Sequence, residues 1–288
     1  MGLATSRFDI WSCTKSVTGT AWGMLLDDCH CDDDAIDLNT PAYQYLPEGL
    51  PLSDQRKSKI TIGHVLTMTS GIKGEDHGLY GVPTSANNGP LEHALGHIEN
   101  RYGRSAAQLA AEPGVRWEYS DPAFAHLSLL FKHIAGMEMH EYVQKRLFNP
   151  IGIEQASFSM LGGAGNIGPH TCGHVGLVIS ARDLARFGLL ACCQGKWNEQ
   201  QIIPQWWCEL ATRSSQTMNP EYGYSWWVNT HQTRWPQLPP DTFALQGHNT
   251  NNCYVIPSLD LVVVKIGSGP TRWNEGDFIN GIVACIED

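Results

Sequence analysis

Long apolar runs and an excess of positive charge are both missing from this sequence. No apolar run reaches the ~18 residues that a membrane-spanning helix needs, so we expect no membrane span. The 288 residues carry 19 Lys and Arg against 29 Asp and Glu, which gives a formal net charge of −10. Proteins bind nucleic acids and anionic membranes chiefly through Lys and Arg, so this balance argues against both as partners.

A signal peptide is missing too. Residues 1–13 are too short and too polar for one, which favours a cytoplasmic location. Hydrophobic residues make up 42% of the chain, and a chain of this length can bury a substantial core without disulfide bonds. We therefore expect a globular protein of one large domain or two smaller ones.

Common metal and catalytic motifs are also absent. The sequence has no C-x-x-C pair, no H-E-x-x-H zinc motif and no G-x-S-x-G nucleophile turn. Residues 163–168 match G-x-G-x-x-G, but no strand closely precedes them and Pro169 follows. That context argues against a dinucleotide-binding turn.

The nine cysteines are an odd number, so at least one thiol is unpaired in a monomer. We interpret most of them as small buried side chains in a reducing compartment, without a disulfide framework. Cys29, His30 and Cys31 precede three aspartates and have metal-binding side chains, although neighbouring residues rarely share one tetrahedral site. We favour an acidic loop after a helix and expect no metal site.

Apolar periodicity, capping residues and helix breakers predict a mainly helical first part and a strand-rich end. The predicted helices cover 12–28, 59–71, 91–100, 104–112, 120–136, 138–148, 183–193 and 204–213, with loops at 73–90 and 161–176. Short β-branched and aromatic segments predict antiparallel strands at 222–229, 242–248, 251–257 and 259–267, before a final helix at 273–288.

One nucleophile pattern, Ser-x-x-Lys, is present twice, at Ser12/Lys15 and at Ser70/Lys73. On a helix, residues i and i+3 share a face, so the hydroxyl and the amine can reach hydrogen-bond distance. A Lys whose pKa is lowered by burial can then accept the Ser proton during acyl transfer. Ser12 and Lys15 lie in a strong helical pattern, whereas Gly71 interrupts the second pair. We expect only the first pair to form a site.

Several segments place the first pair in a family pattern. In chain order they are WSCTKSVTGTAWGMLLDD, QYLPE, KITIGHVLTMTSGI, PGVRWEYSD, LFNPIGI and GLVISARDLARFG, followed by FALQGHNTNNCYVIPSLDLVVV. From about residue 7 onward the chain resembles the serine hydrolases related to class C β-lactamases. That family includes penicillin-binding esterases, D-amino-acid peptidases and 6-aminohexanoate-oligomer hydrolases. The resemblance implies an α/β (α+β) fold of the β-lactamase/transpeptidase type, with an antiparallel sheet flanked by helices and a mainly helical lobe.

The family pattern implies roles for individual residues. Ser12 would be the nucleophile, Lys15 would activate it, and Tyr119 would act as general base or proton shuttle. A late strand of the family ends in Lys-Thr-Gly or His-x-Gly, and that place falls here on Leu245–Gly247. The resemblance then implies an oxyanion hole built from the backbone N–H groups of Ser12 and His248.

Two positions depart from the family pattern. Asp121 stands where the family usually has Asn, and an ionised Asp121 near Lys15 would raise the pKa of the amine and oppose its use as a base. Three alternatives remain open: Asp121 is protonated, it caps a helix, or Tyr119 carries the proton. Leu245 replaces the cation that anchors a substrate carboxylate. This replacement argues against β-lactams and D-Ala-D-Ala peptides, and it favours esters or amides with a neutral acyl side.

Two further groups are candidates for the site. His174–Gly176 is a literal His-x-Gly, but it precedes a helix instead of ending a late strand. Trp11, Tyr80, Trp226 and Trp227 could line a substrate cleft, although aromatic residues are more often part of the core.

We therefore predict a serine hydrolase that cleaves a small-molecule ester or amide through an acyl-enzyme and needs no metal or cofactor. A carboxylesterase is favoured, and an amidase is close behind. The alternatives are a β-lactamase or D-Ala-D-Ala peptidase, and a catalytically silent binding protein of the same fold.

The lobes and the sheet edge can also be predicted. Residues 1–27 and 175–288 should form the α/β lobe, and residues 28–174 the helical lobe. Relatives usually place strands before the Ser-x-x-Lys helix, so we expect the sheet to lack its N-terminal strands. It would then expose an edge that a second copy of the chain could cover as a homo-oligomer. The same expectation leaves the cellular location open.

Overall fold

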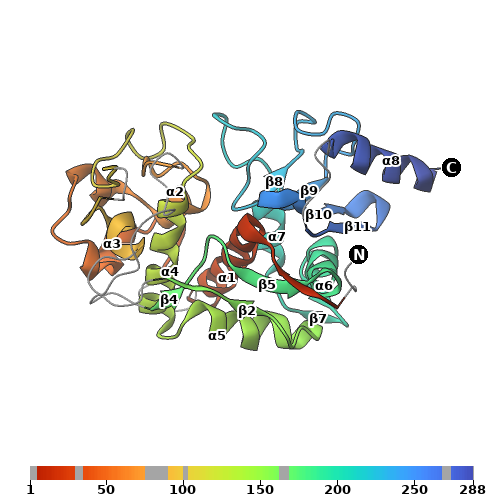
Figure 1. Ribbon diagram of the computed structural model, residues 1–288, viewed down its shortest axis with the longest axis horizontal. Coiled ribbons are helices and arrows are strands. Elements are labelled where there is room, and N and C mark those ends of the chain that lie inside the picture. Colours follow the sequence, from red (N-terminus) through yellow and green to blue (C-terminus); the bar gives the residue numbers. More distant parts are fainter. Residues whose placement is uncertain are drawn as a thin grey trace.

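Helix α1 (Thr14–Asp28) runs through the middle of the molecule, with a sheet on one side and shorter helices on the other (Figure 1). The computed structural model describes residues 5–29, 35–74, 90–99, 103–161, 169–267 and 274–287. Within these ranges, no helix is both long and apolar enough to span a bilayer.

Helix α1 is buried on all its faces. Every side chain from Thr14 to Leu26 is buried, which is typical of a helix at the centre of a core. A Cβ atom on Gly23 would lie 2.1 Å from the Trp207 ring, so the glycine lets α7 (Gln205–Ala211) pack directly on the α1 backbone. Both halves of the molecule therefore pack against this one helix.

Two of the longer helices, α4 (Asp121–Ala135) and α6 (Ala181–Cys192), begin at a serine cap. The remaining helices are α2 (Ile62–Leu66), α3 (Pro90–Leu95), α5 (Met139–Val143) and α8 (Glu275–Glu287). The Ser120 hydroxyl accepts a hydrogen bond from the Ala123 amide at the start of α4, and Ser180 accepts one from the Asp183 amide in α6. Short 3-10 or π turns cover Ala42–Tyr45, Pro47–Gly49, Gln55–Lys59, Gln144–Phe148, Asn149–Ile151, His248–Thr250 and Pro257–Leu259.

A four-stranded antiparallel sheet forms the C-terminal part, in the order β11-β10-β9-β8. Its strands are β8 (Trp227–Val228), β9 (Phe243–Gly247), β10 (Asn251–Ile256) and β11 (Leu261–Lys265). Helix α8 covers one face, where Ile279 and Val283 join a cluster with Tyr254. Helix α6 covers the other face, and a Cβ atom on its Gly188 would lie 2.7 Å from the Cys253 sulfur.

A smaller sheet, in the order β1-β5-β2, leads into the 3-10 turn Trp11–Cys13, which holds Ser12. It consists of β1 (Arg7–Asp9), β5 (Leu177–Ser180) and β2 (Ser157–Phe158), and two strand pairs lie outside it: β3 (Met160–Leu161) with β4 (His170–Thr171), and β6 (Lys196–Trp197) with β7 (Gln200–Gln201). Just after β1, the Ile10 amide donates to the Leu177 carbonyl at 3.0 Å. The approach to Ser12 is therefore held against β5.

The predicted fold class is confirmed, but two predicted helices are not. Residues 103–112 form no helix, because their backbone groups bind other segments: the Leu109 amide donates to Asp54 and the Ala110 amide to the Gly71 carbonyl. The helix predicted at 59–71 covers only Ile62–Leu66, since the chain turns at Met68, which has a φ of 60°. The four late strands are confirmed in shortened form, and 222–229 keeps only β8.

The main hydrophobic core is continuous across both predicted lobes. It joins Val17 of α1 and Phe124 of α4 to Phe243 and Leu245 of β9. The lobe boundaries therefore stay a prediction. Within the described chain, β11 has a strand neighbour on one side only and all five of its residues are partly exposed, while β1 pairs with β5 and not with β11. The predicted cover by a second copy remains untested.

The described cysteines are all free thiols, and their burial varies more than expected. Cys13, Cys172, Cys208 and Cys253 are buried, as predicted for small core residues. Two others, Cys193 and Cys285, are exposed at the surface.

Candidate active site

The Ser12 hydroxyl lies in a 3-10 turn immediately before α1. Trp11 opens this turn with a φ of 52°, an uncommon conformation for a residue with a side chain, and its amide donates to the Asp9 carboxylate at 2.8 Å. Lys15 follows in the first turn of α1, and its Nζ donates to Ser12 Oγ at 2.9 Å. The expected i, i+3 contact is thus present, across the junction between a 3-10 turn and an α-helix.

Lys15 is buried and surrounded by acceptors. Its side chain is 1% exposed, and its Nζ lies 2.7 Å from Asp121 Oδ1 and 2.9 Å from the His174 carbonyl. Burial alone would lower the pKa of Lys15, but the Asp121 carboxylate and Tyr119 outweigh it, so the pKa is raised above its ordinary value. Lys15 is therefore an ammonium in the resting site.

Asp121 is the counterion of Lys15 and not a helix cap. Ser120 caps α4, which leaves the Asp121 carboxylate, at the first helical position, directed toward Lys15. Burial favours the protonated carboxyl, yet the attraction of Lys15 outweighs it and lowers the pKa of Asp121. Of the three alternatives for Asp121, capping is wrong because Ser120 caps α4, and the contact with Lys15 favours the ionised carboxylate over the protonated one.

Tyr119 lies beside this pair, in an extended segment before α4. Its ring centroid is 4.8 Å from Lys15 Nζ, and its hydroxyl is on the side of Lys15 and Ser12. Burial raises the pKa of the phenol, the positive charge of Lys15 opposes that rise, and Asp121 adds to it; the net pKa is raised. Tyr119 is therefore a neutral phenol at rest, within reach of the nucleophile.

The end of β9 contacts the turn that holds Ser12. A Cβ atom on Gly247 would lie 2.2 Å from the Ile10 carbonyl oxygen and 3.1 Å from the Ser12 nitrogen, so only glycine fits there. His248 follows, exposed, with its ring 5.2 Å from that of Trp11. The two amides expected to form an oxyanion hole, those of Ser12 and His248, thus belong to segments in contact with each other.

Leu245 does not offer its side chain to a substrate. It is fully buried in the main core and pairs with Cys253 of β10. The position where the family has a cation is therefore filled by a core leucine, whose buried side chain is not available to contact a substrate.

Two contributors to the site were underrated or missed in the sequence. The main-chain carbonyl of His174 accepts a hydrogen bond from Lys15. Its segment precedes β5 in the sequence, well before the late strands where the family has its His-x-Gly. Burial lowers the pKa of its imidazole to about 4. Phe124 of α4, whose ring lies 5.7 Å from Lys15 Nζ, carried no sequence signal beyond helical periodicity.

The second Ser-x-x-Lys pair forms no nucleophile site. Ser70 Oγ accepts a hydrogen bond from the Ile72 amide at 3.3 Å, and Gly71 turns the chain with a φ of 77°. The Lys73 carbonyl instead accepts a hydrogen bond from Ser120 Oγ at 3.0 Å. This segment therefore supports the start of α4.

Of the aromatic residues predicted to line a cleft, Trp227 lies beside the site and Trp226 lies in the core. Trp227 lies parallel to Tyr119, with ring centroids 6.4 Å apart, and Arg234 lies 4.0 Å above the Trp227 ring. Trp226 is buried against Phe187 and belongs to the core. Tyr80, His30, Cys31 and the glycines of 163–168 lie outside the described residues.

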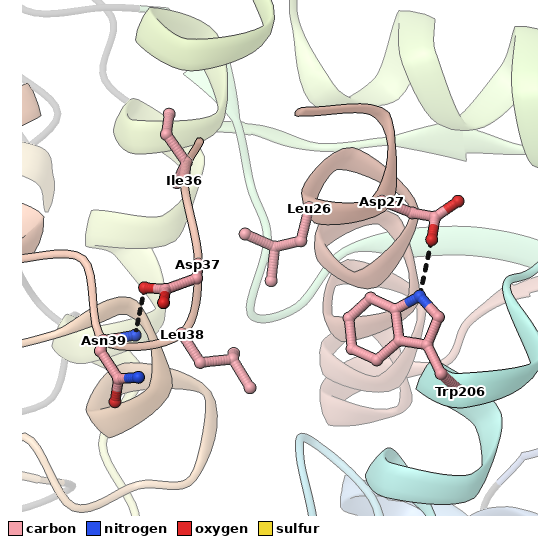
Figure 2. Close-up of a pocket in the computed structure, with 7 residues that line it drawn as sticks. All are labelled: Leu26, Asp27, Ile36, Asp37, Leu38, Asn39 and Trp206. Carbon is pink, nitrogen blue, oxygen red and sulfur yellow. Dashed lines mark hydrogen bonds between the residues drawn. The ribbon is translucent and has the colours of Figure 1, made fainter. Parts of the chain in front are cut away.

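A hollow lies near the C-terminal end of α1 (Figure 2). It has a volume of about 430 Å³ and is lined by Leu26, Asp27, Ile36, Asp37, Leu38, Asn39 and Trp206. At 1.5 Å per residue, Asp27 is about 18 Å from Lys15 along the helix axis. Asp27 accepts a hydrogen bond from the Trp206 indole at 2.6 Å, and Asp37 accepts one from the Asn39 amide at 2.8 Å. Among the described residues that line this hollow, both carboxylates accept hydrogen bonds and none carries a hydroxyl, thiol or amine nucleophile.

Comparison with known proteins places this geometry in a family. The model of the beta-lactamase family matches residues 4–273. A candidate 6-aminohexanoate-dimer hydrolase from Bacillus anthracis is 21% identical, with a TM-score of 0.72 over 99% of this chain and 72% of that one. EstCE1, a hydrolase with promiscuous acyltransferase activity, is 18% identical, with a TM-score of 0.72 over 99% and 86%. A penicillin-binding protein from Bacillus halodurans is 19% identical, with a TM-score of 0.71 over 99% and 87%. At such identities the three structures show a shared fold.

Proposed function

The chain belongs to the beta-lactamase family, a family of hydrolases, and on that premise we propose that it is a serine hydrolase that cleaves carboxylic esters or amides through an acyl-enzyme on Ser12. The observation that carries this proposal is the contact of Ser12 Oγ with Lys15 Nζ, at 2.9 Å, beside the Tyr119 ring, whose centroid lies 4.8 Å from Lys15 Nζ. A nucleophile in contact with a proton acceptor and a fixed charge is the arrangement that covalent acyl transfer needs.

Tyr119 is the general base of the proposed reaction. Lys15 is held as an ammonium by Asp121, so it cannot accept a proton in the resting charge state. In the reactive form Tyr119 is a phenolate, which the neighbouring ammonium stabilises. Ser12 Oγ attacks the substrate carbonyl carbon while its proton passes to the Tyr119 oxygen.

The remaining steps return the site to its starting state. The N–H groups of Ser12 and His248 stabilise the negative charge on the carbonyl oxygen. Tyr119 then gives its proton to the leaving alkoxide or amine, and the acyl group stays on Ser12. A water molecule, deprotonated by Tyr119, attacks the acyl carbon. The bond from that carbon to Ser12 Oγ breaks, Tyr119 returns the proton to Ser12 Oγ, and the carboxylic acid leaves.

The charges around the site favour substrates with a neutral acyl side. Lys15 is balanced by Asp121, and Arg234 Nη1 is paired with Glu221 at 3.1 Å. Leu245 is buried and apolar. None of these groups is left to anchor a substrate carboxylate, which argues against β-lactams and D-Ala-D-Ala peptides. Esters come first and short amides second, in line with relatives described as a dimer hydrolase and as a hydrolase with acyltransferase activity.

The test is covalent labelling combined with turnover. Wild type and Ser12→Ala are incubated with a p-nitrophenyl acyl ester and, separately, with a fluorophosphonate, and the intact mass is recorded. We expect a burst of p-nitrophenol and one phosphonate adduct in the wild type only. If the two proteins are equally unreactive, the catalytically silent binding protein is the better interpretation. An adduct formed with a penicillin instead would favour the β-lactamase or peptidase alternative.

A further inference from the structure

A hydrogen-bond network on the α8 side of the sheet ends next to the turn that holds Ser12. Gln246 is at its centre, since its Nε2 donates to Glu275 Oε1 and its Oε1 accepts from Arg234 Nη2. The same Glu275 oxygen accepts from the Trp235 indole at 2.9 Å and from the Tyr254 hydroxyl at 3.0 Å. Both ends of the Gln246 amide are thus held by charged partners on other segments.

The residues after Gln246 have little room to move. Gly247 is in contact with the backbone of Ile10 and Ser12. Beyond His248, Asn249 and Thr250 have φ values of 61° and 60°, and they reverse the chain into β10. The direction of the His248 amide is therefore set by the backbone at Gln246 and Gly247.

The network also reaches the side of the site that holds Tyr119. Arg234 stacks on Trp227 at 4.0 Å, and Trp227 lies parallel to Tyr119. Arg234 is paired with Glu221, and Glu275 accepts from Gln246, so the network holds two carboxylates and one guanidinium. With a net negative charge, this network is suited to holding segments in place and not to binding an anionic substrate.

We propose that Gln246 is a positioning residue: held between Arg234 and Glu275, it aims the His248 amide at the carbonyl oxygen of a substrate bound at Ser12. This inference rests on the proposed function. The oxyanion forms only as the reaction proceeds, so a misdirected amide lowers kcat much more than it raises KM.

The test compares Gln246→Met with Gln237→Met. Gln237 lies in the same β8–β9 loop as Arg234. Its Oε1 accepts from Asn280 Nδ2 at 2.7 Å, so it links this loop to α8 and not to Gln246. On a p-nitrophenyl ester, we expect Gln246→Met to lower kcat about 30-fold, less than the ~10²–10³-fold loss found when an oxyanion donor is removed, because the His248 amide is misdirected but still present. Its KM should stay near the wild-type value, and Gln237→Met should leave kcat unchanged.

A charge swap provides the rescue. Gln246→Glu places a second carboxylate against Glu275, so its activity should be low, and its deficit relative to the wild type at the same pH should shrink toward acid pH. Adding Glu275→Gln to the same chain restores one donor and one acceptor at the contact, so kcat should return most of the way. A wild-type kcat in Gln246→Met, an equal loss in Gln237→Met, or no rescue by the double substitution would overturn the positioning role. If the wild type itself fails to label at Ser12, the proposed function falls and this inference falls with it.

Discussion

The two Ser-x-x-Lys segments of this chain have the same spacing and different structures. From Ser12 to Lys15 the chain is helical without a break, and the hydroxyl and ammonium meet at 2.9 Å. From Ser70 to Lys73 the chain turns at Gly71, and the Ser70 hydroxyl bonds to a backbone amide two residues on. Spacing alone therefore does not make a site, because the i, i+3 contact requires helical backbone at each position between the two residues.

Burial separates the two lysines as well. Lys15 is 1% exposed and needs the Asp121 carboxylate at 2.7 Å to remain charged there. The Lys73 side chain is only partly buried, and its backbone carbonyl supports the cap of α4. In the first pair the charge of the lysine is buried and compensated, as the proposed chemistry requires, whereas the second pair supports the start of α4.

The largest expected effect separates the two serines. Ser12→Ala should lower kcat for ester hydrolysis about 10⁴-fold or more, because no acyl-enzyme can form. Ser70→Ala should leave kcat unchanged, since its hydroxyl bonds only to the local backbone. Steady-state kinetics and intact-mass labelling check both. Comparable losses in the two variants would remove the distinction between the pairs.

The two lysines should differ strongly in their effect on stability. Lys15→Met leaves the Asp121 carboxylate buried without its partner, which should cost about 3–5 kcal/mol of unfolding free energy. Lys73→Met should cost about 0.5 kcal/mol or less, as an ordinary surface substitution does. Urea denaturation measures both. Adding Asp121→Asn to Lys15→Met should recover most of the loss, and no recovery would contradict the buried pair.

The pH dependence of turnover should move when Asp121 is neutralised. Its carboxylate raises the pKa of both Lys15 and Tyr119, so Asp121→Asn should shift the alkaline rise of kcat/KM to lower pH by about 1–3 units. The direction is the same whichever of the two residues is the base. Asp27→Asn, at the far end of α1, is the control and should not move the profile. A shift to higher pH would contradict this charge assignment.

The smallest expected effect concerns buried histidine. Burial keeps His174 neutral in the folded protein, with a pKa of about 4, while the unfolded chain protonates it near pH 6.5. Between these values the unfolded state binds more protons, so stability should rise with pH by about 1 kcal/mol per unit for this group. Denaturation at pH 5 and pH 6 measures the slope, and His174→Gln should reduce it. An unchanged slope would mean that the imidazole is protonated in the folded site.

Local sequence signals predicted much of the fold and, within the candidate site, the contact between Ser12 and Lys15. Capping by Ser120 and Ser180 depends on residues within one turn, and the helices that follow them are present as expected. The same rules failed for residues 104–112, where Asp54 and Gly71 take the backbone amides that a helix would use. Such competition depends on segments far away in the chain, which local pattern cannot reveal.

The sequence by itself determined the nucleophile segment, because the contact between Ser12 and Lys15 needs only a continuous helical turn. Only the tertiary structure decided the charge state of that lysine. The packing of α4 on α1 brings Asp121 against Lys15, and the burial of both makes the ion pair the stable form. In the same way the approach of β9 to Ser12 depends on the sheet, whose strands meet across long sequence separations that no local rule encodes.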